Sequence, residues 1–334
     1  MVRPHPVILP YGTAAIAEAA TLIRGGGIVA VPTETVYGLA ADATNAQAVA
    51  RIYAAKGRPS FNPLIVHVAD LAAAERIAVF DAEARALAAA FWPGPLTLVL
   101  PVREDSGIAS LVTAGLVTIA IRVPRHRAMQ GLIAASGRPL AAPSANVSGG
   151  ISPTTAAHVA RSLGGNVPLI IDDGATEAGL ESTIVAGRTV LRPGPITAEA
   201  LLAHLPGEGR GPIGTSDVTE HDLHPDCPPI GPRPSPGGSA ITAPGQLESH
   251  YAPSKALRLH ATEANSGEWL IGFGDVAGDV TLSASGNLLE AAAKLFDLLH
   301  AADANESPKI AVAPIPFDGI GEAINDRLRR ASHR

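Results

Sequence analysis

The sequence predicts an α/β fold divided into two domains, in keeping with a length of 334 residues, which exceeds the usual size of a single core. Helical and strand-like stretches alternate over the first 200 residues, the pattern of a sheet covered by helices. From about Pro206 to Pro253 the chain is rich in Pro, Gly, Ser and Asp, so we expect a long linker there. A smaller α/β unit follows. The predicted divisions are 1–205, 206–255 and 256–334.

The first domain begins with a helix over Thr13–Arg24, which ends at the glycine run 25–27, because glycine adopts C-cap geometry without steric cost. Asn45 is positioned to cap a second helix. A third helix over Asp81–Phe91 stops at the Trp-Pro-Gly-Pro sequence of 92–95, and Thr154 is predicted to cap a helix that ends at Leu163. Short apolar runs between these helices predict strands: Ile28–Val31, Leu64–Val68, Leu96–Leu100, Thr118–Val123, Leu140–Ala142, Leu169–Asp172 and Ser182–Val185.

The second unit repeats this alternation on a smaller scale. Strands are expected over Ala256–Leu259, Trp269–Phe273 and Ile310–Ala313. Between the last two lies an amphipathic helix, whose apolar face comprises Leu288, Leu289, Ala292, Leu295, Phe296 and Leu299. A helix over Ile320–Arg330 closes the chain.

Composition and charge exclude several classes of protein. The net charge of −6 and a pI near 6.0 argue against a generally basic nucleic-acid binder. The lone Cys227 excludes an intramolecular disulfide framework and a multi-cysteine zinc site. The N-terminus lacks the apolar core of a signal peptide, and no apolar run is long enough for a membrane span. We therefore expect a cytoplasmic protein.

The most informative segment is Pro32-Thr-Glu-Thr-Val-Tyr-Gly-Leu39, which directly follows a predicted buried strand. Ligands bind at strand ends in open α/β sheets, so this polar stretch is a candidate site. An ordinary β-turn, in which the hydroxyls satisfy local amides, is an equal alternative.

A second segment carries two cations, Lys56 and Arg58, with a glycine between them, and continues through Asn62 to His67. In an extended chain these cations would point to the same side, an arrangement suited to a polyphosphate. A solvated basic turn is the alternative.

A third segment, Pro143-Ser-Ala-Asn-Val-Ser-Gly149, follows another short apolar strand. Its small hydroxyl and amide residues can donate to phosphate oxygens. Three further candidates are Ser182, Arg192 and Arg122. Since Arg122 lies inside an apolar strand, it needs a buried anion or another partner.

Taken together, the segments PTETVYGL, AKGRP with NPLIVH, PSANVSG, ESTIV and LRPGPI closely resemble the YrdC-type family of threonylcarbamoyl-AMP synthases. The linker segment SPGGSAITAPGQLESHYAP and the C-terminal IPFDGIGEAINDRLRRAS resemble the longer, two-domain members. The resemblance implies a YrdC-like twisted mixed sheet flanked by helices, followed by a smaller Rossmann-like α/β domain. It also implies an enzyme, a nucleotidyltransferase, that converts ATP, L-threonine and bicarbonate to threonylcarbamoyl-AMP and pyrophosphate.

The resemblance assigns roles to individual residues. Lys56 and Arg58 are implied to be catalytic, and they hold the triphosphate together with Ser144 and Asn146. The nucleotide site is implied to be completed by Asn62, Thr118, Ser152, Arg192 and, from the linker, Tyr251. The threonine site is implied to comprise Thr35, His67, Arg122, the backbone at Ala142, and Ser182.

Magnesium is the implied cofactor, carried on the phosphates of ATP, with no metal ligands assigned in the protein. Because both reactants are anionic, converging cations are needed to bring them together. Exclusion of water should protect the unstable carbamate, a task that suits a Gly- and Pro-containing lid. Gln246 stands where family linkers often carry Met, and the segment between Ser235 and His250 is longer than in the shortest relatives. The product is destined for the machinery that makes threonylcarbamoyladenosine in tRNA, but direct tRNA binding is not required.

Other functions fit the sequence less well. The linker run from His221 to Cys227 lacks the helical frame of a metal site, and the glycines after Gly272 match a dinucleotide fingerprint only weakly. An RNA-binding or regulatory module would use a basic patch formed by Arg122, Arg125, Arg127 and Arg138. A carbamoyltransferase is disfavoured because neither an acylphosphatase-like nor a zinc-finger segment precedes the domain.

Overall fold

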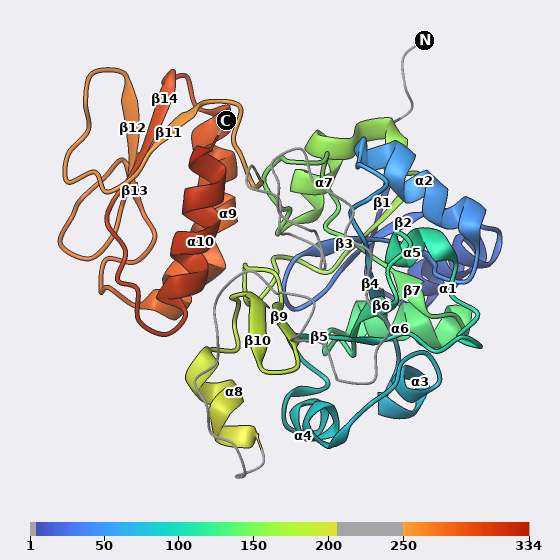
Figure 1. The fold of residues 1–334 in the computed structure, drawn as a ribbon. Coiled ribbons are helices and arrows are strands. Elements are labelled where there is room, and N and C mark those ends of the chain that lie inside the picture. Colours follow the sequence, from blue (N-terminus) through green and yellow to red (C-terminus); the bar gives the residue numbers. More distant parts are fainter. Residues whose placement is uncertain (1–4, 206–249, 334) are drawn as a thin grey trace.

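The computed structural model describes residues 5–205 and 250–333. These residues form a large sheet with flanking helices and a smaller sheet with two long helices (Figure 1). The predicted two-part α/β fold is thus confirmed. The candidate metal run from His221 to Cys227, residue Gln246 and most of the predicted linker lie outside the described residues.

The large sheet is mixed, as the family resemblance implied. Its strands, in spatial order, are β1 (Val7–Pro10), β8 (Leu169–Asp172), β2 (Val29–Pro32), β3 (Tyr37–Asp42), β7 (Leu140–Ala141), β4 (Ile65–His67), β6 (Thr118–Arg122), β5 (Leu96–Pro101), β9 (Thr183–Ala186) and β10 (Thr189–Arg192). The β4–β6 and β5–β9 pairs are parallel, whereas β3 is antiparallel to both of its neighbours.

Helices flank this sheet and bury its apolar faces. They are α1 (Thr13–Arg24), α2 (Ala46–Lys56), α3 (Leu71–Glu75), α4 (Ala82–Phe91), α5 (Ser110–Thr113), α6 (Arg127–Ser136), α7 (Ala156–Leu163) and α8 (Ala198–His204), with a short 3₁₀ turn at Gly164–Asn166. Burial of Ile16 and Ile23 from α1 and of Leu132 from α6 against β2 and β8 forms one core, and most of the remaining buried residues form another.

Local signals predicted some boundaries correctly. Asn45 caps α2, its side chain accepting from the amides of Gln47 and Ala48. The predicted cap at Thr154 is wrong by one residue: Thr155 accepts from the amide of His158, while the Thr154 hydroxyl contacts the His158 ring. Either threonine fits the sequence pattern, and tertiary contacts decide between them.

Several elements were not predicted. The segment following β2 was interpreted as a polar loop, but Tyr37–Asp42 forms β3 in a hairpin with β2. All residues of β3 are buried, so the alternating pattern of a half-exposed strand is absent. Strand β1 was also missed. Unlike β3 it is an edge strand, and its residues Val7 and Ile8 are exposed rather than buried.

The C-terminal domain has a four-stranded parallel sheet in the order β11 (Ala256–Arg258), β14 (Lys309–Val312), β12 (Glu268–Gly272) and β13 (Val280–Thr281). Helix α9 (Leu288–Ala304) lies where the amphipathic pattern predicted a helix, and it buries Leu295, Phe296 and Leu299. The closing helix, α10, spans Gly321–Ser332.

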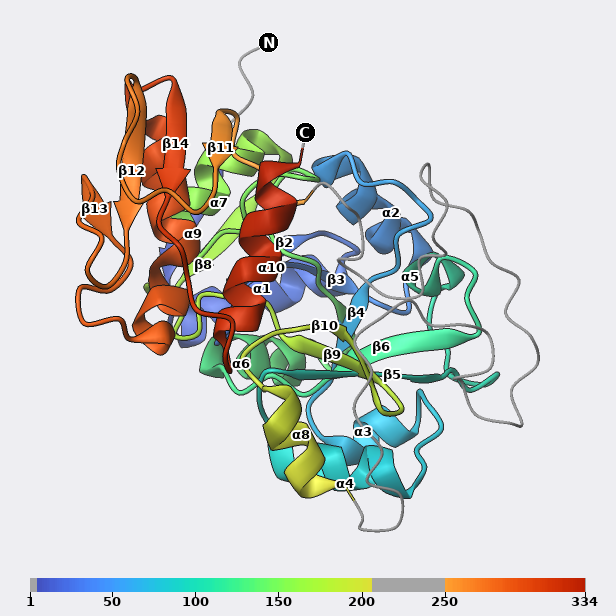
Figure 2. The same ribbon diagram turned by 60° about the vertical axis from the view of Figure 1, so that its left-hand side comes forward.

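Helices α9 and α10 lie between the small sheet and the N-terminal domain (Figures 1 and 2). His300 of α9 and His158 of α7 stack with ring centroids 3.9 Å apart, and the His300 ring contacts the Ser152 carbonyl at 3.2 Å. Gly179 lies so close to α9 that a β-carbon there would be 2.4 Å from the Ala292 carbonyl oxygen. The two domains therefore meet through close, specific contacts.

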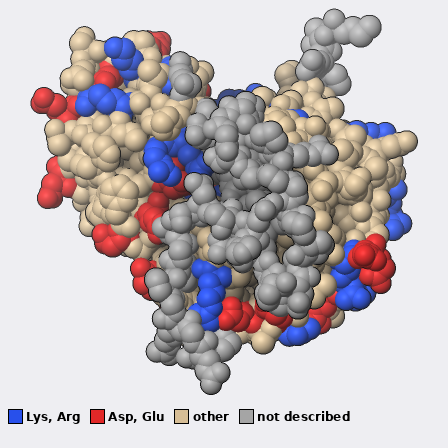
Figure 3. Space-filling view, in the orientation of Figure 1, with Lys and Arg blue, Asp and Glu red and all other residues tan. Residues whose placement is uncertain are grey.

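The visible surface carries interspersed positive and negative side chains where it is not drawn in grey (Figure 3). Among the described residues, no helix combines the length and apolarity needed to span a membrane.

Candidate functional site

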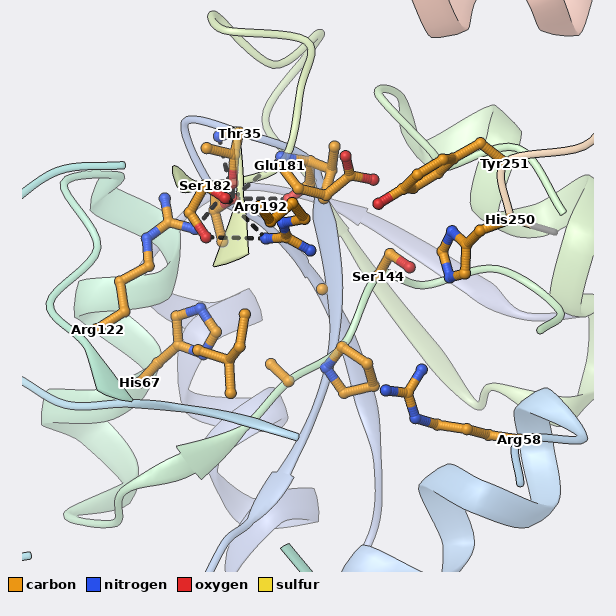
Figure 4. A pocket seen from close by; sticks show the side chains of 16 residues that line it. Thr35, Arg58, His67, Arg122, Ser144, Glu181, Ser182, Arg192, His250 and Tyr251 are labelled. Atoms are coloured by element: carbon orange, nitrogen blue, oxygen red, sulfur yellow. Dashed lines mark hydrogen bonds between the residues drawn. The ribbon is translucent and has the colours of Figure 1, made fainter. Parts of the chain in front are cut away.

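A pocket opens in the N-terminal domain where several strands end (Figure 4). The residues that line it are Thr33, Thr35, Val36, Gly38, Arg58, Ile65, His67, Arg122, Ala142, Pro143, Ser144, Glu181, Ser182, Arg192, His250 and Tyr251. They come from the β2–β3 turn and β3, the segment after α2, β4, β6, the loop after β7, the residues just before β9, the end of β10 and the first described residues after the gap. The structure thus brings together sequence segments that were singled out independently.

The sequence left open whether the segment between β2 and β3 is an ordinary turn or part of a site. In the structure it is both. The Thr33 hydroxyl donates to the Val36 carbonyl at 2.7 Å and accepts from the Thr35 amide at 3.1 Å, which is the ordinary hydroxyl-capped turn. The Thr35 hydroxyl instead accepts from Nη1 of Arg122 at 2.9 Å. The turn therefore holds Thr33 by local hydrogen bonds and places the Thr35 hydroxyl beside Arg122 in the pocket.

Glu34 is the buried anion that Arg122 was predicted to need. Its Oε1 lies 2.7 Å from Nη2 of Arg122, and both side chains are buried. Burial by itself raises the pKa of Glu34, but the charge of Arg122 and the Arg125 amide, which donates to Oε1 at 3.1 Å, outweigh this and lower the pKa to about 2. Glu34 was not predicted as a site residue, because its partner Arg122 lies 88 positions away along the chain.

His67 lies beside Arg122, since the two residues are register partners at the ends of β4 and β6. Burial, and then the charge of Arg122, lower the pKa of His67 to about 3, so the imidazole is neutral at physiological pH. Its Nδ1 is buried without a hydrogen-bond partner in the described part of the chain. A buried polar atom left in this way is rare and marks a place for a ligand group.

Ser182 and Arg192 face each other across the β9–β10 hairpin. Nη2 of Arg192 donates to the Ser182 carbonyl at 2.9 Å and to its hydroxyl at 3.1 Å, and the hydroxyl also contacts Thr97 at 2.7 Å. Gly194 permits this approach, because a β-carbon there would lie 2.5 Å from the amide nitrogen of Thr183.

Lys56 and Arg58 do not lie in the extended stretch that their spacing predicted. Lys56 is the last residue of α2, and Gly57 is its left-handed C-cap with φ 60°. The Lys56 ammonium donates to the carbonyls of Ser144, at 2.5 Å, and of Asn146. Lys56 therefore anchors the loop after β7 from behind, and only Arg58 of the pair lines the pocket.

Arg58 is held by the segment that follows it. Its Nη2 donates to Oδ1 of Asn62 at 2.6 Å and to the carbonyl of Pro63 at 2.8 Å. Burial lowers the pKa of Arg58 to about 10, so its guanidinium remains charged at physiological pH. Asn62 thus contacts the pocket through Arg58 rather than directly.

Three other predicted nucleotide residues also lie outside the pocket lining. Asn146 donates to the carbonyl of Gly150 at 2.7 Å, and the Ser152 hydroxyl donates to Oε1 of Glu181. Thr118 is the first residue of β6, paired opposite Pro101, and Arg122 is at the other end of that strand. The first two support the wall of the pocket, whereas Thr118 lies away from it.

Tyr251 fills one side of the pocket and is fully buried. The adjacent Ala252 amide donates to the Gly149 carbonyl at 2.8 Å, which ties this segment to the loop after β7. Tyr251 itself has φ 64°, a left-handed conformation that non-glycine residues adopt mainly at special sites. Its neighbour His250, which sequence reasoning missed, is also buried in the lining.

Glu181 was also missed, although it directly precedes the predicted Ser182. Within the described residues it is the one acidic side chain of the pocket lining. No group of three or more His, Cys, Asp or Glu residues in that part of the chain could hold a metal ion.

Comparisons with known proteins point to one family. Residues 21–194 match the family described as "Telomere recombination", and residues 196–333 match the C-terminal domain of threonylcarbamoyl-AMP synthase. The chain is 40% identical to threonylcarbamoyl-AMP synthase of Bacillus subtilis, over 95% of this chain and 92% of that protein. It is 39% identical to the protein of the same name from Pyrococcus abyssi, over 95% and 94%.

A solved structure agrees over nearly the full length. The crystal structure of Pyrococcus abyssi Sua5 complexed with L-threonine superposes with a TM-score of 0.83 at 35% identity, covering 98% of this chain and 97% of that one.

Proposed function

The chain belongs to the threonylcarbamoyl-AMP synthase family, and we propose that the pocket described above binds L-threonine and ATP side by side. The reaction of this family joins ATP, L-threonine and bicarbonate into threonylcarbamoyl-AMP and releases pyrophosphate. The proposal concerns which groups of this chain perform each part of that task.

One observation supports the nucleotide side above all. Arg58 and Arg192 are buried and line the same pocket, yet neither forms an ion pair with a carboxylate among the described residues. Their hydrogen bonds go to neutral groups of Asn62, Pro63 and Ser182. Two buried cations without counter-ions are costly, and a polyphosphate would supply the missing negative charge.

The threonine side is supported by Thr35, His67, Arg122 and Ser182, which lie together in the pocket (Figure 4). A small amino acid offers a carboxylate, an amine and a hydroxyl, and this set offers a guanidinium, a neutral imidazole and hydroxyls. The Pyrococcus abyssi relative was solved with L-threonine bound, which fits this assignment.

The proposed chemistry follows from bringing these two groups together. The neutral threonine amine attacks the carbon of bicarbonate, and the bicarbonate hydroxyl leaves with an amine proton as water, which gives a carbamate; a carbamate oxygen then attacks the α-phosphorus of ATP. The new P–O bond replaces the bond to the bridging oxygen, and pyrophosphate leaves with that oxygen. Arg58 and Arg192 would stabilise the negative charge that gathers on the phosphates. His67, with its low pKa, would orient substrate rather than remove a proton.

Magnesium would enter with ATP. Mg²⁺ usually keeps several waters and is bound through substrate phosphates with one or two carboxylates, so a protein cage is not needed, and Glu181 is the one acidic side chain that the described residues contribute to the pocket lining. Bound in this way, the ion would neutralise phosphate charge. We also propose a cytoplasmic location, where the product would pass to the machinery that modifies tRNA.

An RNA-binding module is less well supported. The basic patch predicted for it is wrong at Arg122, which is buried and paired with Glu34. Arg125, Arg127 and Arg138 are paired with Glu177, Asp173 and Asp42, respectively. The positive charge of each of these three arginines is therefore largely balanced by the carboxylate beside it.

Threonine-dependent pyrophosphate release tests the assignment of the nucleotide side. Because Arg58 is proposed to contact the phosphates, Arg58→Ala should lower kcat/KM for ATP by about 100-fold or more. Arg85→Ala, which removes an exposed arginine paired with Glu75, is the matched control and should retain full activity. Unchanged turnover in Arg58→Ala would show that the phosphate site lies elsewhere.

A further inference from the structure

Arg327 belongs to helix α10 of the C-terminal domain, yet its guanidinium reaches the wall of the pocket in the N-terminal domain. The side chain is fully buried. Its Nε donates to Oε2 of Glu181 at 2.9 Å, and its Nη1 donates to the carbonyl oxygen of Pro193 at 2.9 Å. Its Cζ lies over the ring of Tyr251, 5.2 Å from the ring centroid.

These three contacts fall on three separate parts of the pocket wall. Glu181 directly precedes Ser182, and Pro193 directly follows Arg192. Tyr251 belongs to the segment that follows the gap in the described chain. One side chain from the other domain therefore connects the start of β9, the end of β10 and the aromatic residue that fills one side of the pocket.

The charge of Arg327 is already balanced. Nη1 also donates to Oδ2 of Asp326 at 2.9 Å, and Glu181 supplies a second carboxylate. Burial alone lowers the pKa of this guanidinium, but Tyr251, Glu181 and Asp326 together hold the pKa above its ordinary value. Arg327 thus differs from Arg58 and Arg192, which lack carboxylate partners among the described residues, and it is not a spare cation for phosphate.

We infer that Arg327 is a positioning residue for ATP, through which the C-terminal domain completes the nucleotide side of the pocket. It holds Glu181, the backbone next to Arg192, and the Tyr251 ring in one arrangement. The inference rests on the proposed function of the pocket, and it assigns a task within that function to the C-terminal domain.

The contacts of Arg327 distinguish the two halves of the pocket. Tyr251, Arg58, Ser144 and His250 lie on one side, whereas Thr35, His67, Arg122 and Ser182 lie on the other, with Arg192 beside Ser182 (Figure 4). Arg327 contacts Tyr251 and the residues adjoining Arg192, but none of its hydrogen bonds reaches the second group. Its loss should therefore impair ATP binding more than threonine binding.

Calorimetric titration of the full chain with ATP, and separately with L-threonine, tests this inference. Arg327→Met should raise the Kd for ATP by about tenfold or more, since small misplacements of positioning groups have large effects. The Kd for L-threonine should change by less than about twofold, because its binding groups lie outside the contacts of Arg327. A role in folding alone would weaken both affinities together, or neither, and either result would overturn the inference.

Two further variants make the test decisive. Arg327→Lys keeps a cation beside Asp326 and Glu181 but cannot contact both Glu181 and the Pro193 carbonyl as the planar guanidinium does. It should fold and still show the selective loss of ATP affinity, which covers the case in which Arg327→Met does not fold. Arg329→Met, at an exposed arginine of the same helix that also contacts Asp326, is the matched control and should bind both ligands normally.

The inference and the proposed function can fail separately. If the unmodified chain binds both ligands but makes no threonylcarbamoyl-AMP, the proposed function fails, while the selective effect on ATP affinity still tests Arg327. If the unmodified chain makes the product and Arg327→Lys binds ATP as tightly, the inference about Arg327 is wrong and the function stands.

Discussion

At the residue scale, the pocket depends on charges that are balanced on one side and unbalanced on the other. Glu34 neutralises Arg122 beside Thr35, which leaves a nearly neutral, hydrogen-bonding surface suited to a zwitterionic amino acid. Arg58 and Arg192 have no such carboxylate partner among the described residues and suit a polyanion. The difference in charge balance would therefore direct threonine to Arg122 and the phosphates of ATP to Arg58 and Arg192.

The Glu34–Arg122 pair leads to a prediction in which a double variant recovers stability but not threonine affinity. Arg122→Gln leaves the Glu34 carboxylate buried and unpaired, so the free energy of unfolding should fall by about 3–5 kcal/mol. Glu34→Gln combined with Arg122→Gln should recover most of that loss, because no charge is then buried alone. Threonine affinity should stay low in the double variant. Denaturant titration and calorimetry measure the two properties, and normal threonine binding by the double variant would contradict the assigned role of Arg122.

At the element scale, α7 and α9 carry the histidines that stack between the domains. The Thr154 amide donates to Nδ1 of His158 at 3.3 Å, which places the proton of the neutral ring on Nε2, 3.4 Å from Asp297 Oδ1. Burial, and then the charge of Arg161, lower the pKa of His158 to about 4. Burial, and then the charge of His158, lower the pKa of His300 to about 3. Both rings must therefore be neutral in the folded protein.

This contact predicts the direction of the pH dependence of stability. Above about pH 6.5, the ordinary histidine pKa, both rings are neutral in the folded and the unfolded state, and they impose no penalty. As the pH falls from about 6.5 towards 4, the unfolded state binds protons first, so the free energy of unfolding should decrease. His300→Gln should reduce this slope in thermal unfolding measured from pH 7.5 to 5, whereas His204→Gln, at an exposed histidine of α8, should not. An identical slope in His300→Gln would contradict the account.

The sequence could predict elements with strong local signals, and much of the pocket, but not the contacts that join them. The cap and apolar pattern of α2, and the apolar periodicity of α9, sufficed for these two helices, and the family segments identified nine of the pocket-lining residues. Strand β3 lacked an alternating pattern because all of it is buried. The extended conformation expected for Lys56 was wrong because α2 continues to that residue. Pairs such as Glu34 with Arg122, and Glu181 with Arg327, join residues far apart in sequence, which no local pattern indicates.

At the scale of the whole molecule, the C-terminal domain contacts the wall of a pocket that the N-terminal domain, His250 and Tyr251 line. Arg327 of α10 contacts Glu181, and Tyr251 packs against Phe296 of α9 with ring centroids 5.5 Å apart. The loop that leads to Glu181 also touches the backbone of α9 at Gly179. The C-terminal domain therefore supports the pocket wall at Glu181 and Tyr251 across a close interface.

Gly179 provides a test of that interface. A methyl group at this position would lie 2.4 Å from the Ala292 carbonyl oxygen, and φ is +68°, so Gly179→Ala should separate the loop from α9. Stability should fall by about 1–3 kcal/mol from overpacking, with a higher KM for ATP because Glu181 is displaced. Gly174→Ala is the control: φ there is +79°, but nothing lies within 4 Å. If both variants behave alike, the effect comes from backbone strain and not from the interface.

We propose that this pocket joins threonine, bicarbonate and ATP. The most direct test incubates the full chain with ATP, L-threonine, carbon-13 bicarbonate and Mg²⁺, and follows the products by mass spectrometry. We expect threonylcarbamoyl-AMP that carries the labelled carbon, with pyrophosphate formed in equal amount, and neither product when threonine is omitted. Pyrophosphate that forms equally well without threonine, or the absence of any labelled adenylate, would contradict it.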